Sequence, residues 1–366
     1  MLLKINRKII NTLIVSSLYI GGGFVANLSQ LNASQEQLQL QKLLDAFPAS
    51  KINWKEISEI ISANPELLTA QNSNGRTALH SVMQCKDPDV VKKFVELIPK
   101  KDRIVLLSTK GKYKCPPPYL AVGLGNLGAV KVLIELIPEK DRKAFLNIPD
   151  VNNEQTLLHR AMEQRDVNII KALLEPTPEK DRIDCLSMKD KDNEWTPLHW
   201  AVWTRKLDIV EALIKFIPEK DGMAFLKIRD NKGWTPLAWA MVRAKAKAME
   251  AEKDEAIIVA LTSKFDANKL ASHIKTYRDK DGRTLLHLAV LGGKCDRVKW
   301  IVDALGKKSK KTLIKIMNYK DEFKQTPLQL AKSLAKGNSS NERTTIIKFL
   351  EETEKSNEVK KVKNKL

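Results

Sequence analysis

A block of about 40 residues recurs seven times along this chain, and this repetition limits the possible folds more than any other feature. The clearest copy spans Asp192–Asp221 and contains the hexapeptide Thr196-Pro197-Leu198-His199-Trp200-Ala201. The residue at the Thr196 position recurs at intervals of 40, 39, 40, 39, 49 and 42 residues, as Thr77, Pro117, Thr156, Thr196, Thr235, Thr284 and Thr326. Such a period indicates a stack of units, each of which buries its apolar face against its neighbours.

Each unit has the pattern of a helix, a turn and a second helix. Thr196 can cap a helix with its hydroxyl, and Pro197 suits the first helical turn, where no amide donor is needed. After a short polar break, five apolar residues at helical spacing predict a second helix: Ile209, Val210, Leu213, Ile214 and Ile217. Runs such as Asp230-Asn231-Lys232-Gly233 predict a tight turn before the hexapeptide. Four other turns are predicted less firmly because another residue replaces the Gly: Cys115, Glu154, Glu194 and Lys324.

The hexapeptide resembles the T-P-L-H-x-A signature of the ankyrin repeat family. The resemblance implies an all-α repeat solenoid, an ankyrin-repeat stack of helix–turn–helix units with short β-hairpin tips. It also implies that the His at the His199 position ties the tip to the helix by hydrogen bonding, with the Thr three residues earlier as its partner. Armadillo and HEAT solenoids have a similar period but lack the Thr-Pro-Leu-His block.

The period exceeds the roughly 33 residues of ordinary ankyrin repeats. The extra residues have a recurring sequence after the second helix, as in Ile137-Pro138-Glu139-Lys140-Asp141-Arg142 and Ile217-Pro218-Glu219-Lys220-Asp221-Gly222. Each Pro should end the second helix, and the acidic residue after it suits the start of a further short helical turn. We therefore expect a lengthened connection along one edge of the stack.

The sequence divides into four regions. Residues 1–33 are expected to be a signal peptide or membrane anchor, and residues 34–70 a linker with amino-terminal capping helices. Residues 71–352 form the predicted ankyrin-repeat domain of seven repeats, the last of which caps the stack. Residues 353–366 are predicted to be a basic disordered tail.

The first region leaves three readings open. Lys4, Arg7 and Lys8 precede Ile9–Leu28, which has no charged side chain, as in a secretory signal or a membrane anchor. Three consecutive glycines at 21–23 weaken a spanning helix, and no clear A-x-A cleavage site follows. A cleaved signal, a retained anchor and a disordered start therefore remain alternatives. We expect a secreted or membrane-anchored protein, with a cytoplasmic protein as the alternative.

The formal net charge of +19 favours acidic partners, anionic lipid or nucleic acid. The same charge also fits a solvated Lys-rich surface with no binding role. No run of basic residues interleaved with aromatics resembles a nucleic-acid module. A basic scaffold that docks on an anionic membrane or on nucleic acid is the alternative function.

The sequence argues against an enzyme. Four of the five histidines occupy one repeat position, so a single structural role covers them: His80, His159, His199 and His287. The four cysteines lie in different repeats without a CxxC pair. No phosphate-loop, nucleophile-elbow or zinc-protease motif occurs. We expect a monomer that binds a protein partner, without a metal, a cofactor or a small-molecule substrate.

Candidate binding residues follow from the resemblance, because ankyrin repeats bind partners with their tips and the exposed part of the first helix. At those positions the sequence places three tryptophans on adjacent repeats, Trp195, Trp203 and Trp234, flanked by Arg243. Arg76 and Arg283 occupy the tip position of two other repeats. Aromatic residues and Arg are enriched in binding hot spots. The alternative is that a Trp before the hexapeptide packs along neighbouring tips. Trp200 and Trp239 are predicted to be core residues.

Overall fold

The computed structural model describes residues 52–71, 75–111, 115–150, 154–242, 248–263, 267–306, 309–337 and 340–363. It divides into two compact units, Met1–Asp141 and Arg142–Leu366, which we treat separately. Both units are helical, and the described residues contain no strand. The all-α repeat architecture predicted from the sequence is confirmed.

The first unit begins with the predicted capping segment. Helix α3 (Trp54–Ala63) and the short 3-10 helix η2 (Pro65–Leu68) bury Ile57 and Leu67, and η2 packs against the first repeat helix. The repeat helices of this unit are α4 (Ala78–Val82), α5 (Pro88–Glu96), α6 (Arg103–Leu107), α7 (Pro117–Gly123) and α8 (Leu127–Leu136), and the division between the units falls within α9 (Glu139–Leu146).

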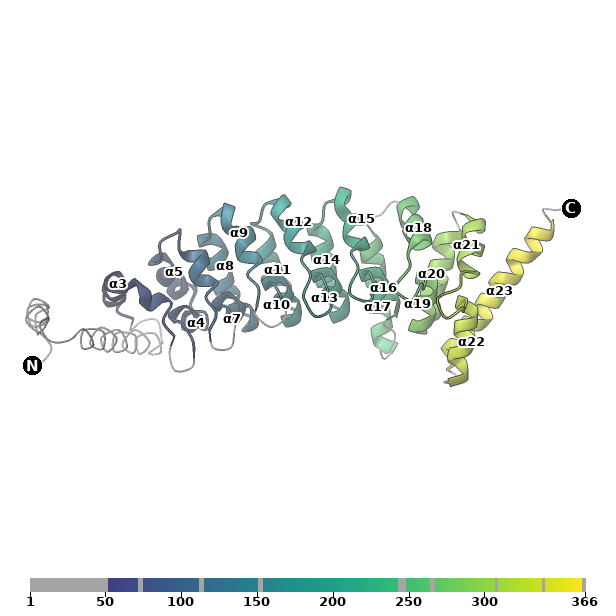
Figure 1. The fold of residues 1–366 in the computed structure, drawn as a ribbon, viewed down its shortest axis with the longest axis horizontal. Coiled ribbons are helices and arrows are strands. Elements are labelled where there is room, and N and C mark those ends of the chain that lie inside the picture. Colours follow the sequence, from purple (N-terminus) through teal and green to yellow (C-terminus); the bar gives the residue numbers. More distant parts are fainter. Residues whose placement is uncertain are drawn as a thin grey trace, which may run out of the picture. The chain divides into compact units, whose positions relative to one another are not determined.

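The second unit consists of helix triplets and a terminal pair (Figure 1). We call the helices of each triplet first, second and third. First helices pack on the next first helix: α10 (Leu157–Gln164), α13 (Pro197–Thr204), α16 (Pro236–Val242), α19 (Leu285–Gly292) and α22 (Pro327–Gly337). The second helices are α11 (Val167–Leu174), α14 (Leu207–Phe216), α17 (Ala248–Thr262) and α20 (Cys295–Gly306). The last helix, α23 (Asn341–Lys363), packs on α20, α21 and α22.

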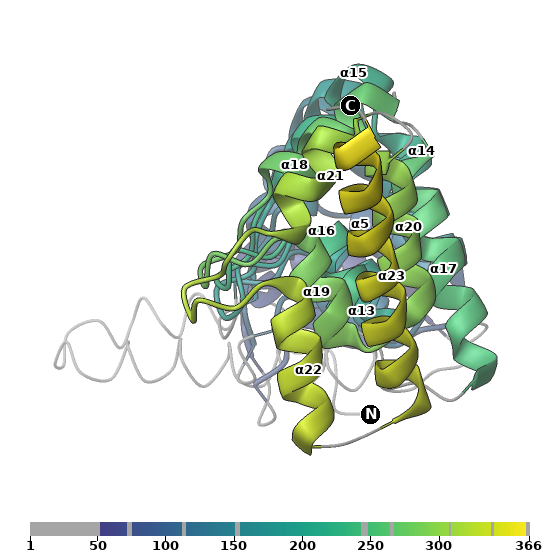
Figure 2. The same cartoon turned by 90° about the vertical axis from the view of Figure 1, so that its right-hand side faces the viewer.

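The extra residues of each repeat form a whole third helix, which is more than the short turn that the sequence predicted. These helices are α12 (Glu179–Ser187), α15 (Glu219–Lys227), α18 (Ala267–Thr276) and α21 (Lys310–Met317), together with α6 and α9. In the second unit, α12, α15, α18 and α21 lie along one edge (Figure 1), and α15, α18 and α21 are seen at the end away from α22 in the end-on view of Figure 2. Each is held by a pair of adjacent buried residues, such as Phe145–Leu146 in α9 and Phe225–Leu226 in α15. Burial of two large side chains adds enough apolar contact to stabilise two helical turns.

An arginine in the third helix ties two repeats together. The Arg103 guanidinium donates from Nη1 to the Leu136 carbonyl at 2.6 Å, at the end of the next second helix. Arg142 makes the equivalent bond to the Pro176 carbonyl, and Arg182 lies over the Phe216 ring. These contacts explain why Arg recurs after Lys-Asp in three successive repeats. The next repeat carries Gly222 instead.

The predicted Thr–His pairs form capping boxes at four first helices. The Thr196 amide donates to His199 Nδ1 at 3.2 Å, so Nδ1 accepts and Nε2 carries the proton. Nε2 in turn lies 3.1 Å from the Trp234 carbonyl of the next repeat. The same bonds recur at Thr77–His80, Thr156–His159 and Thr284–His287. The partner predicted for this His is confirmed, and its bond to the next repeat is an additional finding.

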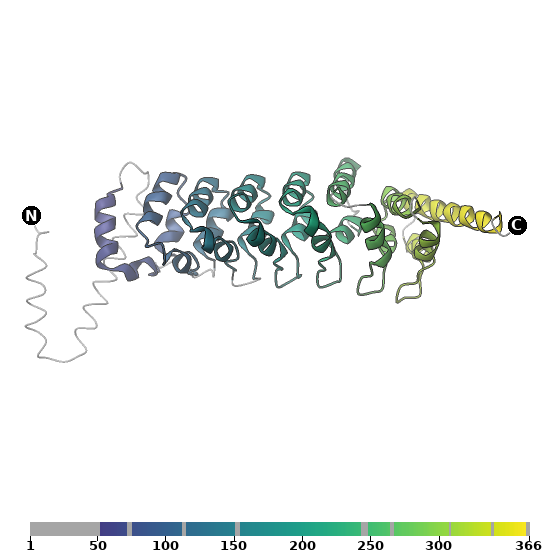
Figure 3. The same cartoon turned by 90° about the horizontal axis from the view of Figure 1, so that it is seen from above.

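The turns that precede the first helices, which we call tips, are tight turns in place of β-hairpins. They project to one side of the second unit (Figure 3). In the second unit, a backbone bond from the Asp amide closes each tip, as from the Asp190 amide to the Trp195 carbonyl at 2.9 Å. Glu154, Glu194 and Lys324 adopt the left-handed conformation that Gly takes at other tips. The turn therefore forms even where the sequence lacks Gly, because a buried Asp holds it, as described below.

The carboxyl-terminal tail also differs from its prediction. Helix α23 continues to Lys363, whereas residues 353–366 were predicted to be disordered. Its buried Ile346 and Leu350 anchor the first half of the helix, and the rest extends it without Gly or Pro to end it. Within the described residues, no helix has the length and apolar character needed to cross a bilayer. Residues 1–33, including the predicted leader, lie outside the described part of the chain.

Candidate functional site: a tryptophan cluster on tips and first helices

Five tryptophans from two adjacent repeats pack together in the second unit. Trp195 lies at the centre, with ring centroids 5.2 Å from Trp200, 5.3 Å from Trp203 and 5.0 Å from Trp239. Trp239 also contacts Trp234 at 4.7 Å and Trp203 at 5.3 Å. Most of these pairs are edge-to-face, the geometry that favours aromatic attraction. We call these five residues the tryptophan cluster.

A buried aspartate in each tip holds the cluster in place. Asp230 is 4% exposed and accepts four N–H groups with its two carboxylate oxygens. Oδ1 accepts the backbone amides of Lys232 at 2.8 Å and Trp234 at 2.7 Å, which fixes the turn. Oδ2 accepts the indole N–H of Trp239 at 2.7 Å and that of Trp195, from the preceding tip, at 3.2 Å. One side chain therefore shapes its own tip and joins it to the previous repeat.

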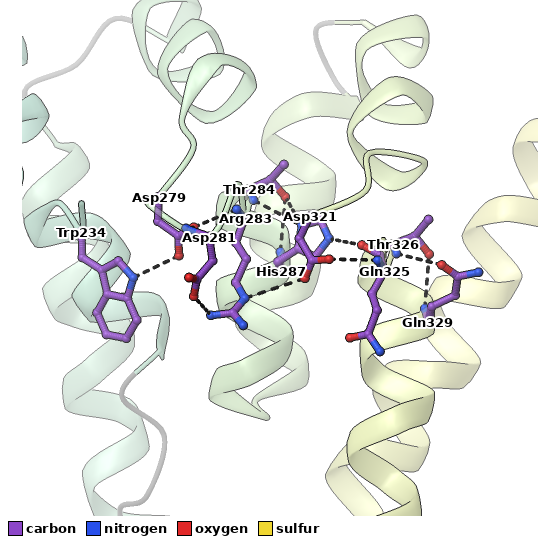
Figure 4. A network of polar contacts seen from close by, with 10 residues as sticks. All are labelled: Trp234, Asp279, Asp281, Arg283, Thr284, His287, Asp321, Gln325, Thr326 and Gln329. Atoms are coloured by element: carbon purple, nitrogen blue, oxygen red, sulfur yellow. Dashed lines mark hydrogen bonds and ion pairs between the residues drawn. The ribbon is translucent and has the colours of Figure 1, made fainter. Parts of the chain in front are cut away.

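The same arrangement recurs along the second unit. Asp190 holds its own tip and accepts the Trp200 indole at 2.8 Å. Asp279 accepts the indole N–H of Trp234 at 3.1 Å (Figure 4). In the following tip Asp321 binds the Gln325 amide, and Arg283 takes the place of the tryptophan, with Nε 3.8 Å from Asp321 Oδ2. The position before the hexapeptide thus contacts the next tip in three successive repeats.

The structure separates the predicted binding residues into different environments. Trp195 is only 7% exposed, Trp234 is half-buried, and Trp203 is 38% exposed. Arg283 is half-buried and pairs with Asp281. Arg76 is half-buried in the first unit and is not placed relative to the cluster, and Arg243 lies outside the described residues.

Two related predictions have mixed outcomes. Trp239 is 8% exposed and is a core residue, as predicted. Trp200 is half-buried instead of being a core residue, and its indole N–H donates to the buried Asp190 carboxylate of its own tip. The packing of Trp195 and Trp234 against the next tip is the structural alternative that the sequence left open.

Sequence reasoning missed the buried aspartates. They recur five or six residues before the Thr position, where their polarity reads as ordinary turn chemistry, as Asp190, Asp230, Asp279 and Asp321; the half-buried Asp150 occupies the same position one repeat earlier. The periodicity itself was the available signal, since a charged residue at the same place in five successive repeats marks a shared structural role. Within the described residues, no group of three His, Cys, Asp or Glu side chains could hold a metal ion.

Five buried histidines make the stability of the fold depend on pH. Burial lowers the pKa of His199 to about 4, because a charged imidazole would lose its solvation. His273 replaces the apolar residue of the buried pair in α18; burial, then Lys227 and Arg229, lower its pKa to about 4. Burial also lowers the pKa of His80, His159 and His287. The neutral forms therefore belong to the folded state.

We expect the protein to lose stability in mild acid. Because the folded-state pKa of His273 lies below its unfolded value near 6.5, the unfolded state binds more protons as the pH falls from about 6.5 to 4. Between pH 7 and pH 5, His273 should contribute a loss of about 2 kcal/mol. His273→Phe, which copies Phe145 and Phe225, should remove that share of the loss in urea unfolding at both pH values. An unchanged difference between the two pH values would contradict this role.

Comparison with known proteins agrees with this geometry. A family model described as ankyrin repeats (3 copies) matches residues 118–224 and 182–251. The solved structure of the ankyrin repeat domain of Bcl-3, described as a unique member of the IkappaB protein family, is similar in fold. The alignment has a TM-score of 0.50 and 21% identity, and covers 70% of this chain and 95% of that one. A search of curated proteins found no significant match.

The repeated triplets, the Thr–His capping boxes and the projecting tips define a helical repeat protein built to present a surface. The ankyrin-repeat sequence pattern is recognised over residues 118–251, and the fold is similar to that of an ankyrin-repeat domain over a larger part of the chain. Ankyrin repeats are general protein–protein interaction modules.

Proposed function

We propose that this protein is a non-enzymatic scaffold that binds a protein partner around Trp203, and that residues 1–33 export it or hold it at a membrane. The exposure of Trp203 is the observation that carries the binding proposal. An indole that is 38% exposed offers apolar surface that a partner would bury, and Trp is among the residues most enriched in hot spots.

The setting of Trp203 supports this role. Trp195 and Trp239 brace its ring from behind at 5.3 Å each, and the Asp230 carboxylate fixes both of those indoles. A side chain held this firmly loses little conformational entropy when a partner binds. Trp203 also stands on the first helix α13, beside the projecting tips, where ankyrin repeats bind their partners.

The binding proposal is tested by selecting displayed random peptides on the full chain. Clones that bind the unaltered protein should bind Trp203→Ala about 30-fold more weakly, corresponding to a hot spot of about 2 kcal/mol. Val105→Ala removes an apolar side chain that is 68% exposed in the first unit, and serves as the matched control. Clones that bind Trp203→Ala as tightly as the unaltered protein would argue against a binding site around Trp203.

The export proposal rests on the basic start and uncharged stretch of residues 4–28. Expression of the full chain in a bacterial host, followed by fractionation and intact mass, tests it. A product shortened by about 20 to 33 residues outside the inner membrane supports a cleaved signal, and full-length protein in the membrane supports an anchor. Full-length protein in the cytosol would overturn both forms of the proposal.

A further inference from the structure

The surface beside the tryptophan cluster changes its charge along the second unit. The tip before α10 carries Asp150 and Glu154 and no basic residue. In the tip before α13, two lysines stand against three carboxylates; Lys189 pairs with Glu194 at 2.8 Å and Lys191 pairs with Glu154 at 3.2 Å, so each cation has an acidic partner. The next three tips carry seven cations: Arg229, Lys232, Arg278, Lys280, Arg283, Lys320 and Lys324. We call residues 228–234, 277–283 and 318–325 the basic tips.

The carboxylates of the basic tips do not balance these cations at the surface. Asp230, Asp279 and Asp321 are between 3% and 8% exposed, and their oxygens are directed to amides, indoles or Arg283 within the protein. The other two carboxylates, Asp281 and Glu322, lie nearer to solvent, and Asp281 pairs with Arg283. In addition, the sequences of α13, α16, α19 and α22 contain no Asp or Glu. The basic tips and the neighbouring first helices therefore form a positive surface.

The aromatic rings of this surface already carry cations. Arg278 lies 3.9 Å from the Tyr319 ring and Arg283 lies 5.2 Å from Phe323, while Arg229 lies 5.3 Å from Tyr277, which is buried and closed to a ligand. Lys232 lies 5.4 Å from Trp234. Binding of single-stranded nucleic acid relies on open aromatic faces for stacking. Here the protein's own side chains occupy a face of each ring, which favours carboxylate groups over bases as ligands. Guanidinium groups are well suited to bind carboxylates.

The distance between successive tips determines how far apart the carboxylates of a bound segment must lie to contact them. Successive tips are joined by single backbone bonds, as from the Glu322 amide to the Asp281 carbonyl at 3.0 Å, so their separation is fixed by the helix stack. Packed helices lie about 8–10 Å apart, and an extended chain advances about 3.3 Å per residue. An extended segment that crosses the tips therefore meets a new tip at about every third residue.

We propose that the basic tips bind an extended acidic segment of a partner protein, with a carboxylate at about every third residue. This inference rests on the proposed protein-binding function and names the chemistry of the partner. The segment lies across the three tips and continues toward Trp203, because Lys232 lies 5.6 Å from the ring of Trp239, which in turn contacts Trp203.

Two synthetic peptides of about twelve residues test the spacing by fluorescence anisotropy with the full chain. Both contain the same Asp, Ser and Gly residues; one has Asp at every third position, and the other has all its Asp residues at one end. The spaced peptide should bind at least about tenfold more tightly, since only its carboxylates can reach all three tips. Equal affinity for the two peptides would show that the net charge of the protein attracts them, whatever the spacing of their carboxylates. That result would overturn the proposal.

A triple variant with one charge reversal in each tip tests their role. It carries Lys232→Glu, Lys280→Glu and Lys324→Glu, and should bind the spaced peptide at least about 30-fold more weakly. Reversing Lys140, Lys171 and Lys180, which are exposed on other helices, changes the net charge equally and should alter the affinity less than about threefold. Circular dichroism confirms that both triple variants fold. A loss of the same size in both variants would place the attraction in the whole-molecule charge and contradict the proposal.

The remaining outcomes separate this inference from the proposed function. Tighter binding of a dT oligonucleotide or of phosphatidylserine vesicles than of the spaced peptide, lost in the same tip variant, would overturn it in favour of nucleic acid or lipid. Displayed peptides that depend on Trp203 but lack acidic residues would overturn it while leaving the protein-binding function intact. If no peptide depends on Trp203 either, the proposed function fails as well.

Discussion

Asp230→Ala is expected to lower the free energy of unfolding by about 4 kcal/mol, because it removes the acceptor of four N–H groups at once. Two of these donors are backbone amides that shape the tip, and two are indoles from different repeats. A buried donor left without an acceptor costs about 1–3 kcal/mol, and the cavity adds to that cost. Urea unfolding followed by circular dichroism measures the change, and tryptophan fluorescence reports on the cluster.

Two further variants separate the carboxylate from general effects at the tip. Asp192→Ala makes the same chemical change at an exposed position of the preceding tip, and should change stability by less than about 0.5 kcal/mol. Asp230→Asn keeps one oxygen for the backbone amides but turns an NH2 group toward two indole N–H donors, so we expect an intermediate loss. A loss in Asp230→Ala no larger than in Asp192→Ala would show that the four bonds add no stability.

Asp254→Ala is expected to cost about 3–5 kcal/mol, because Asp254 neutralises two buried arginines. Its Oδ2 accepts from Arg297 Nη2 at 2.7 Å and from Arg205 Nη2. The three side chains are between 6% and 15% exposed, and burial lowers the pKa of the Arg297 guanidinium. Without the carboxylate, two positive charges would remain close together with little solvent. Unfolding in urea should show the full loss at neutral pH.

The controls for this network use a surface residue and an apolar replacement. Asp303→Ala removes an exposed carboxylate from α20 and should change the free energy of unfolding by less than about 0.5 kcal/mol. Replacing all three network residues, with Asp254→Leu and both arginines changed to Met, should recover much of the loss, since apolar side chains need no charge partner. If the triple variant were less stable than Asp254→Ala, uncompensated charge would not be the cause.

Much of the repeat could be predicted because its signals are local. Thr196, Pro197 and His199 lie within one helical turn, so their capping role depends only on chain geometry that the sequence itself specifies. The apolar spacing of Ile209, Val210 and Leu213 likewise predicts the second helix and its buried face. The repetition of these signals predicted the stack, since a unit with one apolar face needs neighbours.

The roles of the candidate site residues were decided by contacts between repeats. Trp195 and Trp203 have the same side chain and lie eight positions apart, yet one is 7% exposed and the other 38%. The difference arises because the Asp230 carboxylate, 35 residues further along the chain, draws the Trp195 indole into the next tip. No local pattern contains that bond.

By itself, the sequence determined the repeat, its helices, their caps and the surplus of positive charge, since each of these depends on residue types and their local order. The tertiary structure alone decided that the residues beyond the ordinary repeat length form third helices, that the recurring aspartates turn inward, and that basic side chains gather on three successive tips. These features depend on which side chains of neighbouring repeats come within contact distance. That is a property of the stack, because a carboxylate can turn inward only where another repeat supplies the N–H groups to receive it.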